Sequence, residues 1–255
     1  MSKAAWRLAS FAFAALLIAL WEFLVDQGVI SRVFFPAPSR AFAVLQEWVS
    51  SGELWGPLAG TIWRTFAGWL AATALGVILG AVIASSTVTR DLFEPTVEFL
   101  RPLPSSAMIP PAILLLGLTD SMVLAVVVFG SIWPILLGAI HGFRSVEPRL
   151  MELSRTLRMG RFHRLWRIAL PNALPEIFAG MRVSLAIALI ITVVAEMLSS
   201  RPGLGQLILL AARAFRSPEI FAGVFLLGAI GFLSNLLLER VEAHFLRWRP
   251  AVGGA

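Results

Sequence analysis

Long apolar stretches alternate with short polar ones along most of the 255-residue chain. Several reach the roughly 20 residues that a helix needs to cross a hydrocarbon core of about 30 Å. Because a backbone in lipid must satisfy its own hydrogen bonds, these stretches predict helices rather than loops or open sheets. The six predicted spans are residues 8–26, 57–85, 95–118, 121–141, 173–198 and 219–240. The pattern predicts an all-α, polytopic membrane helical bundle, with residues 1–255 forming a single transmembrane domain.

Composition supports a membrane protein. Hydrophobic residues make up 58% of the chain and charged residues only 14%, well below the quarter or so that is usual in soluble proteins. The net charge of +6 would raise the question of nucleic acid binding in a soluble protein, but in short loops between spans basic residues mark the cytoplasmic side. We therefore expect a lipid bilayer, and no nucleic acid, as a partner. The absence of cysteine excludes disulfides and thiolate chemistry.

The positions of the arginines orient the predicted spans. Residues 142–172, between the fourth and fifth spans, hold seven of them: Arg144, Arg149, Arg155, Arg158, Arg161, Arg164 and Arg167. The positive-inside trend makes this the largest cytoplasmic segment and, with six spans, puts both termini in the cytoplasm. The first stretch is longer than a usual signal-peptide core and lacks a convincing cleavage site, so we expect a retained helix.

Residues 142–172 also show helical periodicity. Val146, Leu150, Leu153 and Leu157 form one apolar face, and Phe162, Leu165, Trp166 and Ala169 form another. The spacing predicts two short amphipathic helices joined by a turn near Gly160, with the second ended by Pro171. Their apolar faces could rest on the bundle itself, in the headgroup region, or in a groove on a partner.

Other local patterns predict interruptions and close packing. Ser39 is a candidate N-cap of a short interfacial helix, and Arg90, Asp91 and Glu94 predict a polar turn before the third span. Prolines predict that the third span is kinked or partly unwound, as a structural bend or as the lining of a path: Pro102, Pro104, Pro110 and Pro111. A stripe of small residues in the second span predicts close helix packing, within the chain or between two copies: Gly68, Ala72, Gly76, Gly80 and Ala84.

Charged residues inside spans are costly and are therefore candidates for function. Arg182 and Glu196 share the fifth span but lie about 21 Å apart along a helix, so they cannot pair with each other. Glu196 is expected near the outer end, in a structural or gating role, reaching water or capping a neighbouring helix. Arg182 could snorkel to the inner interface or attract an anionic solute.

Further residues complete the candidate set. The residues proposed to line a translocation path or gate are Pro104, Met108, Pro110, Arg182 and Glu196. Arg64, beside Trp63, has the pattern of an interfacial anchor, and Asn235 could donate a hydrogen bond between helices. The three histidines show no ligand spacing, so no metal site and no cofactor are expected.

The sequence around the cytoplasmic segment resembles the EAA loop of binding-protein-dependent ABC importer permeases. The matching residues are Glu152, Arg155, Leu157, Leu170, Pro171, Ala173, Leu174, Pro175, Ile177, Gly180 and Arg182. The stretches "FPAPSRAF", "RPLPSSAMIPPAILLLGL" and "VVAEMLSSRPGLGQLI" are similar to the nitrate, sulfonate and taurine branch of that family. The resemblance covers roughly residues 10–248.

This resemblance implies a type I ABC importer permease of the bacterial inner membrane. Such a subunit dimerises, forms the solute path, binds an ABC ATPase at the cytoplasmic loop and receives a solute-binding protein on its outer face. The implied substrate is a small anion such as a sulfonate, taurine or nitrate. The residues expected to couple to the ATPase are Glu152, Leu153, Ser154, Arg155, Leu157, Arg158, Gly160, Leu170 and Pro171.

Missing motifs narrow the function further. The chain has no G-x-x-x-x-G-K-[ST] loop, so ATP hydrolysis must come from a partner, and it lacks H-E-x-x-H and G-x-S-x-G, so we expect no enzyme. An ion-coupled secondary transporter is the alternative, because proline-broken spans are typical of such carriers. Secondary carriers are usually longer and place acidic residues at the midplane, whereas the central spans here are almost free of acids.

The chain departs from the family pattern after Glu152. The family usually has Ala-Ala there and a glycine six residues beyond the glutamate, whereas this chain has Leu153, Ser154 and Arg158 at these positions. The glycine falls two places later, at Gly160. Either Gly160 takes over in a shifted turn or Arg158 adopts a strained backbone conformation.

Overall fold

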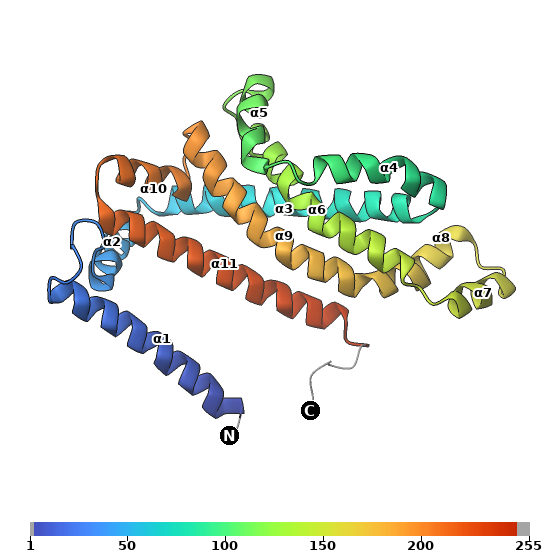
Figure 1. Cartoon of the computed structure of the whole chain (residues 1–255), viewed down its shortest axis with the longest axis horizontal. Helices are drawn as coiled ribbons and strands as arrows, with labels where there is room; N and C mark the ends of the chain where they lie inside the picture. Colours follow the sequence, from blue (N-terminus) through green and yellow to red (C-terminus); the bar gives the residue numbers. More distant parts are fainter. Residues whose placement is uncertain (1–2, 249–255) are drawn as a thin grey trace. The chain divides into compact units, whose positions relative to one another are not determined.

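The computed structural model describes residues 3–248, and helices are the only regular elements among them (Figure 1). In chain order they are α1 (Lys3–Asp26), α2 (Pro38–Ser51), α3 (Trp55–Ala84), α4 (Thr87–Leu100), η1 (Ser105–Met108), α5 (Ile109–Leu116), α6 (Asp120–Arg144), α7 (Pro148–Thr156), α8 (Arg161–Arg164), η2 (Leu165–Ala169), α9 (Leu170–Ser199), α10 (Leu204–Arg213) and α11 (Ser217–Phe245). The all-α prediction is confirmed. The ends of the predicted domain, residues 1–2 and 249–255, lie outside the described residues.

The described chain divides into two compact units. The first unit combines the described residues up to Gly60 with Pro202–Ala229, and the second combines Thr61–Arg201 with the described residues from Ile230 onward. The long helices α3 and α11 each contribute to both units.

Four of the described helices are long and apolar enough to cross a membrane: Trp55–Ala84, Asp120–Arg144, Arg161–Ser199 and Ser217–Phe245. They correspond to the second, fourth, fifth and sixth predicted spans. A fifth span is formed if Thr87–Leu100 and Ser105–Leu116, which meet at an angle of 89°, cross together. Helix α1 contains the first predicted span but does not belong to this set, so membrane crossing by residues 8–26 stays a prediction.

The third predicted span is sharply bent, as its prolines predicted, but the polar turn predicted before it was wrong. Arg90, Asp91 and Glu94 lie inside α4 rather than in a turn, because the Ser86 side chain caps the helix and Arg90 pairs with Glu94 at 3.0 Å one helical turn away. The break falls at residues 101–104, which hold Pro102 and Pro104. Pro110 and Pro111 lie in the first turn of α5, where a missing N–H donor removes no helical hydrogen bond.

The small residues of α3 pack within the chain, against α6. A Cβ added at Gly68 would lie 2.5 Å from Val127 Cγ1, and one at Gly80 would lie 2.5 Å from Ala139 Cβ. Helices α6 and α9 approach equally closely, since a Cβ at Gly138 would lie 2.5 Å from the Glu176 carbonyl oxygen. The buried core of the second unit forms around these contacts, with Met122, Val123, Val126, Val127, Leu185, Ala188 and Ile191 among its members.

In the first unit, α2 begins two residues earlier than predicted. Its N-cap residue is Ala37, with Pro38 in the first turn, so the expectation that Ser39 caps the helix was wrong. The Ser39 hydroxyl instead donates to Glu22 Oε1 of α1 at 2.5 Å, and the Ser39 N–H donates to Oε2 at 3.0 Å. Trp21, Phe35 and Phe221 pack beside this contact with ring centroids 4.8–5.5 Å apart.

Two short helices were predicted in residues 142–172, and only the first is a separate helix. Helix α7 is separate, whereas α8 continues through the π-helical turn η2 into α9, so Arg161–Ser199 is one helix of 39 residues. Pro171 does not end a helix. In the π turn the Leu170 N–H donates to the Leu165 carbonyl five residues back. The wider π turn accommodates Pro171, which has no N–H to donate, so the helix continues.

Candidate functional site

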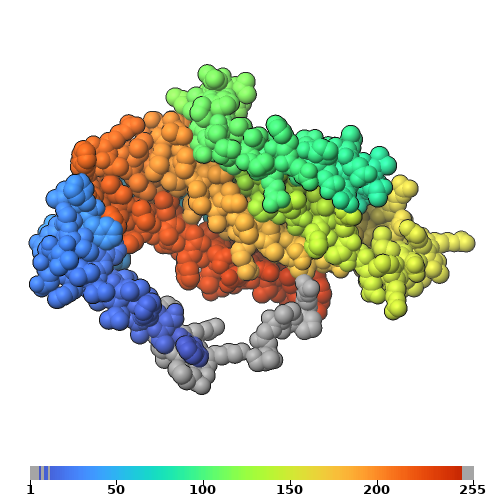
Figure 2. Space-filling view, viewed as in Figure 1, coloured from blue at the N-terminus to red at the C-terminus, as the bar shows by residue number. Residues whose placement is uncertain are grey.

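Helix α7 presents its leucines outward. Leu153 and Leu157 are 55% and 64% exposed, and Ser154 is the buried residue of the helix. Figure 1 shows α7 and α8 beyond the ends of α6 and α9, and Figure 2 shows the same yellow-green and yellow segment protruding from the helices that it joins. Of the three locations predicted for this apolar face, the protein's own helical bundle is therefore wrong. The headgroup region and a groove on a partner remain.

The turn after α7 resolves the question raised by the missing glycine. Arg158 has φ +50°, in the left-handed region, while Gly160 has φ −63° and is the N-cap residue of α8. The Arg158 N–H donates to the Arg155 carbonyl at 2.9 Å, and the Met159 N–H donates to the Ser154 carbonyl at 3.0 Å. These two bonds form a Schellman motif, which usually has glycine where Arg158 stands. The left-handed residue of the turn is therefore Arg158, at the position where the family pattern has glycine, and not Gly160.

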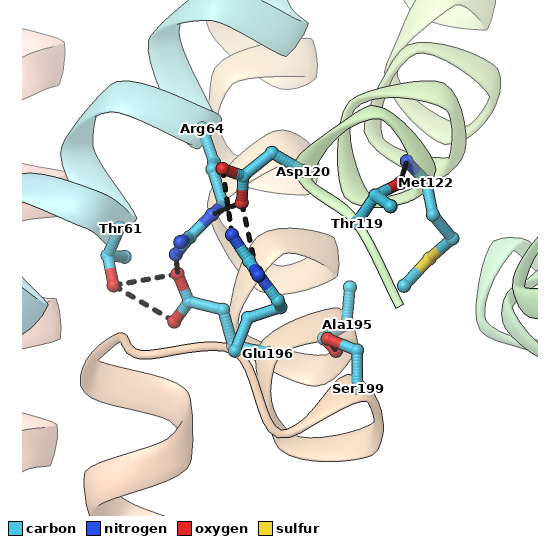
Figure 3. Close-up of polar contacts among 9 residues, drawn as sticks. Thr61, Arg64, Thr119, Asp120, Met122, Ala195, Glu196 and Ser199 are labelled. Atoms are coloured by element: carbon cyan, nitrogen blue, oxygen red, sulfur yellow. Dashed lines mark hydrogen bonds and ion pairs between the residues drawn. The ribbon is translucent and has the colours of Figure 1, made fainter. Parts of the chain in front are cut away.

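Within the second unit, a partly buried cluster of ion pairs joins α3, α6 and α9 (Figure 3). It lies near the C-terminal end of α9, whereas α7 lies beyond the N-terminal end of that helix (Figure 1). Arg64 of α3 donates from Nε to Asp120 Oδ1 at 2.7 Å and from Nη1 to Glu196 Oε1 at 2.8 Å. The Thr61 hydroxyl lies 2.9 and 3.0 Å from the two Glu196 oxygens. Arg201, which follows α9, contacts both Asp120 oxygens at 3.0–3.2 Å. Two arginines and two carboxylates balance the charge of this ion-pair cluster.

Burial makes the ion-pair cluster structurally important. Glu196 is fully buried and the Arg64 side chain is 6% exposed, whereas Asp120 and Arg201 are 44% and 32% exposed. Each buried charge needs its partner, because an unpaired charge in such surroundings is strongly destabilising. The interfacial-anchor interpretation of Arg64 was therefore wrong, although Trp63 is 65% exposed as an anchor would be. Glu196 does not reach water.

The sequence reasoning missed this cluster, although one signal was available. An arginine inside an apolar stretch requires a counter-charge, and Asp120 and Glu196 stand at the ends of the two spans that pack on each other. Asp120 falls between the third and fourth predicted spans, residues 95–118 and 121–141. It is the first residue of α6, directly after the N-cap residue Thr119, whose hydroxyl accepts from the Met122 N–H at 3.3 Å.

Arg182 and Glu196 belong to different sites, as their separation predicted. Arg182 donates from Nη2 to Glu242 Oε2 of α11 at 2.6 Å, and its side chain is 46% exposed. Asn235 donates to Glu239 within its own helix, so the expected bond between helices was wrong. Both residues line a cavity of about 390 Å³ formed by α3, α9 and α11 within the second unit.

The other path candidates lie in the bend between α4 and α5. Pro104 precedes the single turn η1, Met108 ends it, and Pro110 is in the first turn of α5. This bend packs against α6, where a Cβ at Gly130 would lie 2.5 Å from Ser105 Oγ. The five residues predicted to line a path thus lie in three places: the bend, the cavity and the ion-pair cluster. Within the described residues, no group of three or more His, Cys, Asp or Glu side chains is placed to hold a metal ion.

Four helices of membrane-spanning length, a proline-bent pair of helices and a protruding amphipathic helix together define a multi-pass membrane protein. Residues 72–249 match the family model of the binding-protein-dependent transport system inner membrane component, and the chain belongs to this family. It is an ABC importer permease rather than an ion-coupled secondary transporter.

The relatives confirm the resemblance to the sulfonate, taurine and nitrate branch. The chain is 31% identical over 240 residues to the putative aliphatic sulfonates transport permease protein SsuC of Bacillus subtilis, which covers 94% of this chain and 87% of that protein. It is 26% identical over 243 residues to the taurine transport system permease protein TauC of Escherichia coli, which covers 93% and 88%. The bicarbonate transport system permease protein CmpB of Synechococcus elongatus is 27% identical over 201 residues, which covers 78% and 70%.

Solved structures show the same fold. A chain of the MetNI methionine ABC transporter in an inward-facing conformation superposes with a TM-score of 0.62 at 19% identity, covering 78% of this chain and 97% of that chain. A chain of an amino acid ABC transporter gives a TM-score of 0.55 at 18% identity, covering 76% and 92%. The type I importer permease fold is therefore confirmed.

Proposed function

We propose that this chain is the path-forming subunit of an ATP-driven importer and that residues 142–172 dock a separate ABC ATPase. The observation that carries the proposal is the exposure of Leu153 on α7 and of Leu157, the C-cap residue of that helix. Leucines four residues apart share one helix face, which is the arrangement by which a helix seats in a groove on a partner. Burying the side chain of a leucine contributes about 1.5–3 kcal/mol, so two of them are a substantial anchor.

The geometry of the segment suits the transmission of force. The Schellman motif at Arg158 fixes the turn that follows α7, and α8 begins after this turn at Arg161. Because α8 is continuous with α9, a push on the docking helix reaches a membrane-spanning helix through a short turn. Glu152, Ser154, Arg155 and Gly160 support this docking role through their places on α7 and in the turn, while Leu170 and Pro171 begin α9.

The assembly that we propose contains two copies of this chain, two ATPase subunits and one solute-binding protein. The arginines of residues 142–172 favour a cytoplasmic position for this segment, with both termini on the same side. The solute-binding protein would then dock at the opposite end, near the ion-pair cluster. The names of the relatives support a small anion as the solute, and the 31% identity to the aliphatic sulfonates permease favours a sulfonate.

Aspartate substitutions test the docking role. In Leu153→Asp and Leu157→Asp, membrane insertion stays intact because both side chains are outside the core, but the ATPase no longer copurifies and ATP-dependent uptake is lost. Thr156→Asp is the matched control, because it places the same charge on an exposed neighbouring position that lies about 60° around the helix from Leu153 and about 100° from Leu157. Leu157→Met retains an apolar contact and should retain uptake. Uptake at the wild-type rate in both leucine-to-aspartate variants would refute the docking proposal.

A further inference from the structure

A cleft lies within the second unit, between α7, α8 and the ends of α3 and α6, with a volume of about 550 Å³. Figure 1 shows the connection from α3 to α4 at the same end of this unit as α7 and α8. Three arginines line the cleft, Arg155 of α7 and Arg161 and Arg164 of α8, and Ser85 and Ser86 line it from the end of α3. None of the described residues that line this arginine cleft is acidic.

Helix α7 turns different faces to the arginine cleft and to the proposed ATPase. Met151 and Arg155, about one helical turn apart, line the cleft. Leu153 does not line it, and at 3.6 residues per turn it lies about 160° around the helix from both of them. A partner seated on Leu153 therefore approaches from the opposite side of α7 and does not account for the arginines of the cleft.

The three arginines of the cleft carry charge that the chain does not neutralise. Six other described arginines pair with a carboxylate at 2.6–3.6 Å: Arg32, Arg64, Arg90, Arg182, Arg201 and Arg216. Within the described residues, Arg155, Arg161 and Arg164 form no such pair. Arg164 is partly buried, and its Nε has no hydrogen-bond partner there. A partly buried guanidinium without a counter-charge is destabilising, and a bound anion would supply that charge.

Two exposed aromatic rings adjoin the arginine cleft. Phe162 and Trp166 are 74% and 55% exposed, and their ring centroids lie 5.9 Å apart. Phe162 directly follows Arg161, and Trp166 directly follows Leu165, both of which line the cleft. Arginines beside exposed aromatic rings are typical of helices that lie in the headgroup region of anionic membranes. A small free anion would meet the arginines but would leave the aromatic rings uncovered.

The cleft also lies at the depth of a lipid headgroup. Ala81 and Ala84 line it from the last turn of α3, at the end of the second predicted span. Ala169 lines it four residues before the fifth predicted span, or about 6 Å along a helix. The headgroup layer extends about 5–8 Å beyond the hydrocarbon core on each side. The cleft therefore begins at about the level where these two spans leave the hydrocarbon.

We propose that the arginine cleft binds an anionic phospholipid such as phosphatidylglycerol. Arg155, Arg161 and Arg164 surround its phosphate, since guanidinium groups match the geometry of phosphate oxygens, and Phe162 and Trp166 contact its glycerol and upper acyl chains. The lipid fills the space between α7 and the ends of α3 and α6, and it leaves the leucines of α7 free for a partner. The inference concerns the permease alone and does not require the ATPase-docking role.

Lipid titration of the purified permease tests the inference without ATPase or ATP. The full-length protein in neutral detergent is titrated with dihexanoylphosphatidylglycerol, dihexanoylphosphatidylcholine and inorganic phosphate, and binding is measured by microscale thermophoresis. We expect the phosphatidylglycerol to bind more tightly than either of the other two probes. Arg161→Gln combined with Arg164→Gln should weaken phosphatidylglycerol binding about 30-fold, because each arginine near an anionic headgroup raises affinity roughly fivefold.

Two matched double variants separate lipid binding from other effects. Arg149→Gln with Arg167→Gln removes the same charge from exposed positions that do not line the cleft, so affinity should stay within about threefold of wild type in physiological salt. Arg161→Lys with Arg164→Lys keeps both charges, and lysine also binds phosphate, so most of the affinity should remain. An equal loss in the lysine and glutamine variants would assign these arginines a structural role and overturn the inference.

Other outcomes would also overturn the inference. Phosphatidylcholine that binds as tightly as phosphatidylglycerol would show that the cleft does not recognise charge, and inorganic phosphate that binds as tightly would indicate a site for a free anion. Unchanged phosphatidylglycerol affinity in Arg161→Gln with Arg164→Gln would exclude the lipid. If ATPase copurification fell in that case, the arginines would contact an acidic surface of that partner instead. The proposed function is judged separately, by ATPase copurification and uptake in Leu153→Asp and Leu157→Asp.

Discussion

Replacing Glu196 with glutamine should destabilise the protein far more than the same replacement at Glu242. Both carboxylates accept from an arginine at 2.6–2.8 Å, so the two contacts look alike by distance. They differ in burial: the Arg64–Glu196 pair is 6% and 0% exposed, whereas the Arg182–Glu242 pair is 46% and 25% exposed. The comparison therefore isolates the effect of the surroundings on one type of interaction.

The expected magnitudes follow from that burial. Removing one partner of a buried pair costs about 3–5 kcal/mol, and the lower end applies here because Arg64 keeps Asp120 and glutamine keeps an acceptor for Thr61. A loss of about 3 kcal/mol lowers the melting temperature of a chain of this size by about 6–12 °C. An exposed pair contributes about 0–1 kcal/mol, which corresponds to less than about 4 °C.

Thermal unfolding in nanodiscs, followed by the fluorescence of the nine tryptophans, measures both values. A double variant, Arg64→Met with Glu196→Gln, should lose less than the sum of the two single losses, because each single variant leaves a buried charge without one of its partners. If Glu196→Gln melts within about 2 °C of wild type, or if Glu242→Gln falls as far as Glu196→Gln, burial does not govern these pairs and the reasoning fails.

Three further substitutions test the backbone geometry. Arg158→Gly should raise the melting temperature by about 2–4 °C, because glycine adopts the positive φ of the Schellman turn without the penalty of about 1 kcal/mol that a side chain incurs. An unchanged or lower melting temperature would contradict the strain assigned to Arg158. Gly138→Ala should destabilise the protein by about 1–3 kcal/mol, because the new Cβ would lie 2.5 Å from the Glu176 carbonyl oxygen. Gly160→Ala has open space around the new Cβ, so its melting temperature should stay within about 2 °C of that of the wild type.

Hydrophobic length identified the long helices because membrane spans have a composition that depends little on tertiary context. The bend of the third span was equally visible, since Pro102 and Pro104 act locally on the backbone. Helix ends were harder to predict. Ser39 has the right chemistry for an N-cap, but Pro38 already begins the helix and Glu22 takes the serine hydroxyl.

The candidate site was predicted well where it depends on local pattern and poorly where it depends on packing. The exposure of Leu153 and Leu157 follows from their spacing on a short helix, and the choice between Arg158 and Gly160 was posed correctly as a question of backbone conformation. The partners of Arg64 come from residues 56 and 132 positions away, and no periodicity in the sequence links such positions.

The uninterrupted helix Arg161–Ser199 has a mechanical consequence. At 1.5 Å per residue its 39 residues form a rod of about 58 Å, with the three arginines of α8 and η2 near one end and Glu196 near the other. If such a rod tilts by about 5° about one end, its far end sweeps about 5 Å, one helical pitch. The salt bridges of Glu196 would then have to break or move with the helix end. A tilt set near the arginines of α8 and η2 would therefore strain the ion-pair cluster at the other end of the helix.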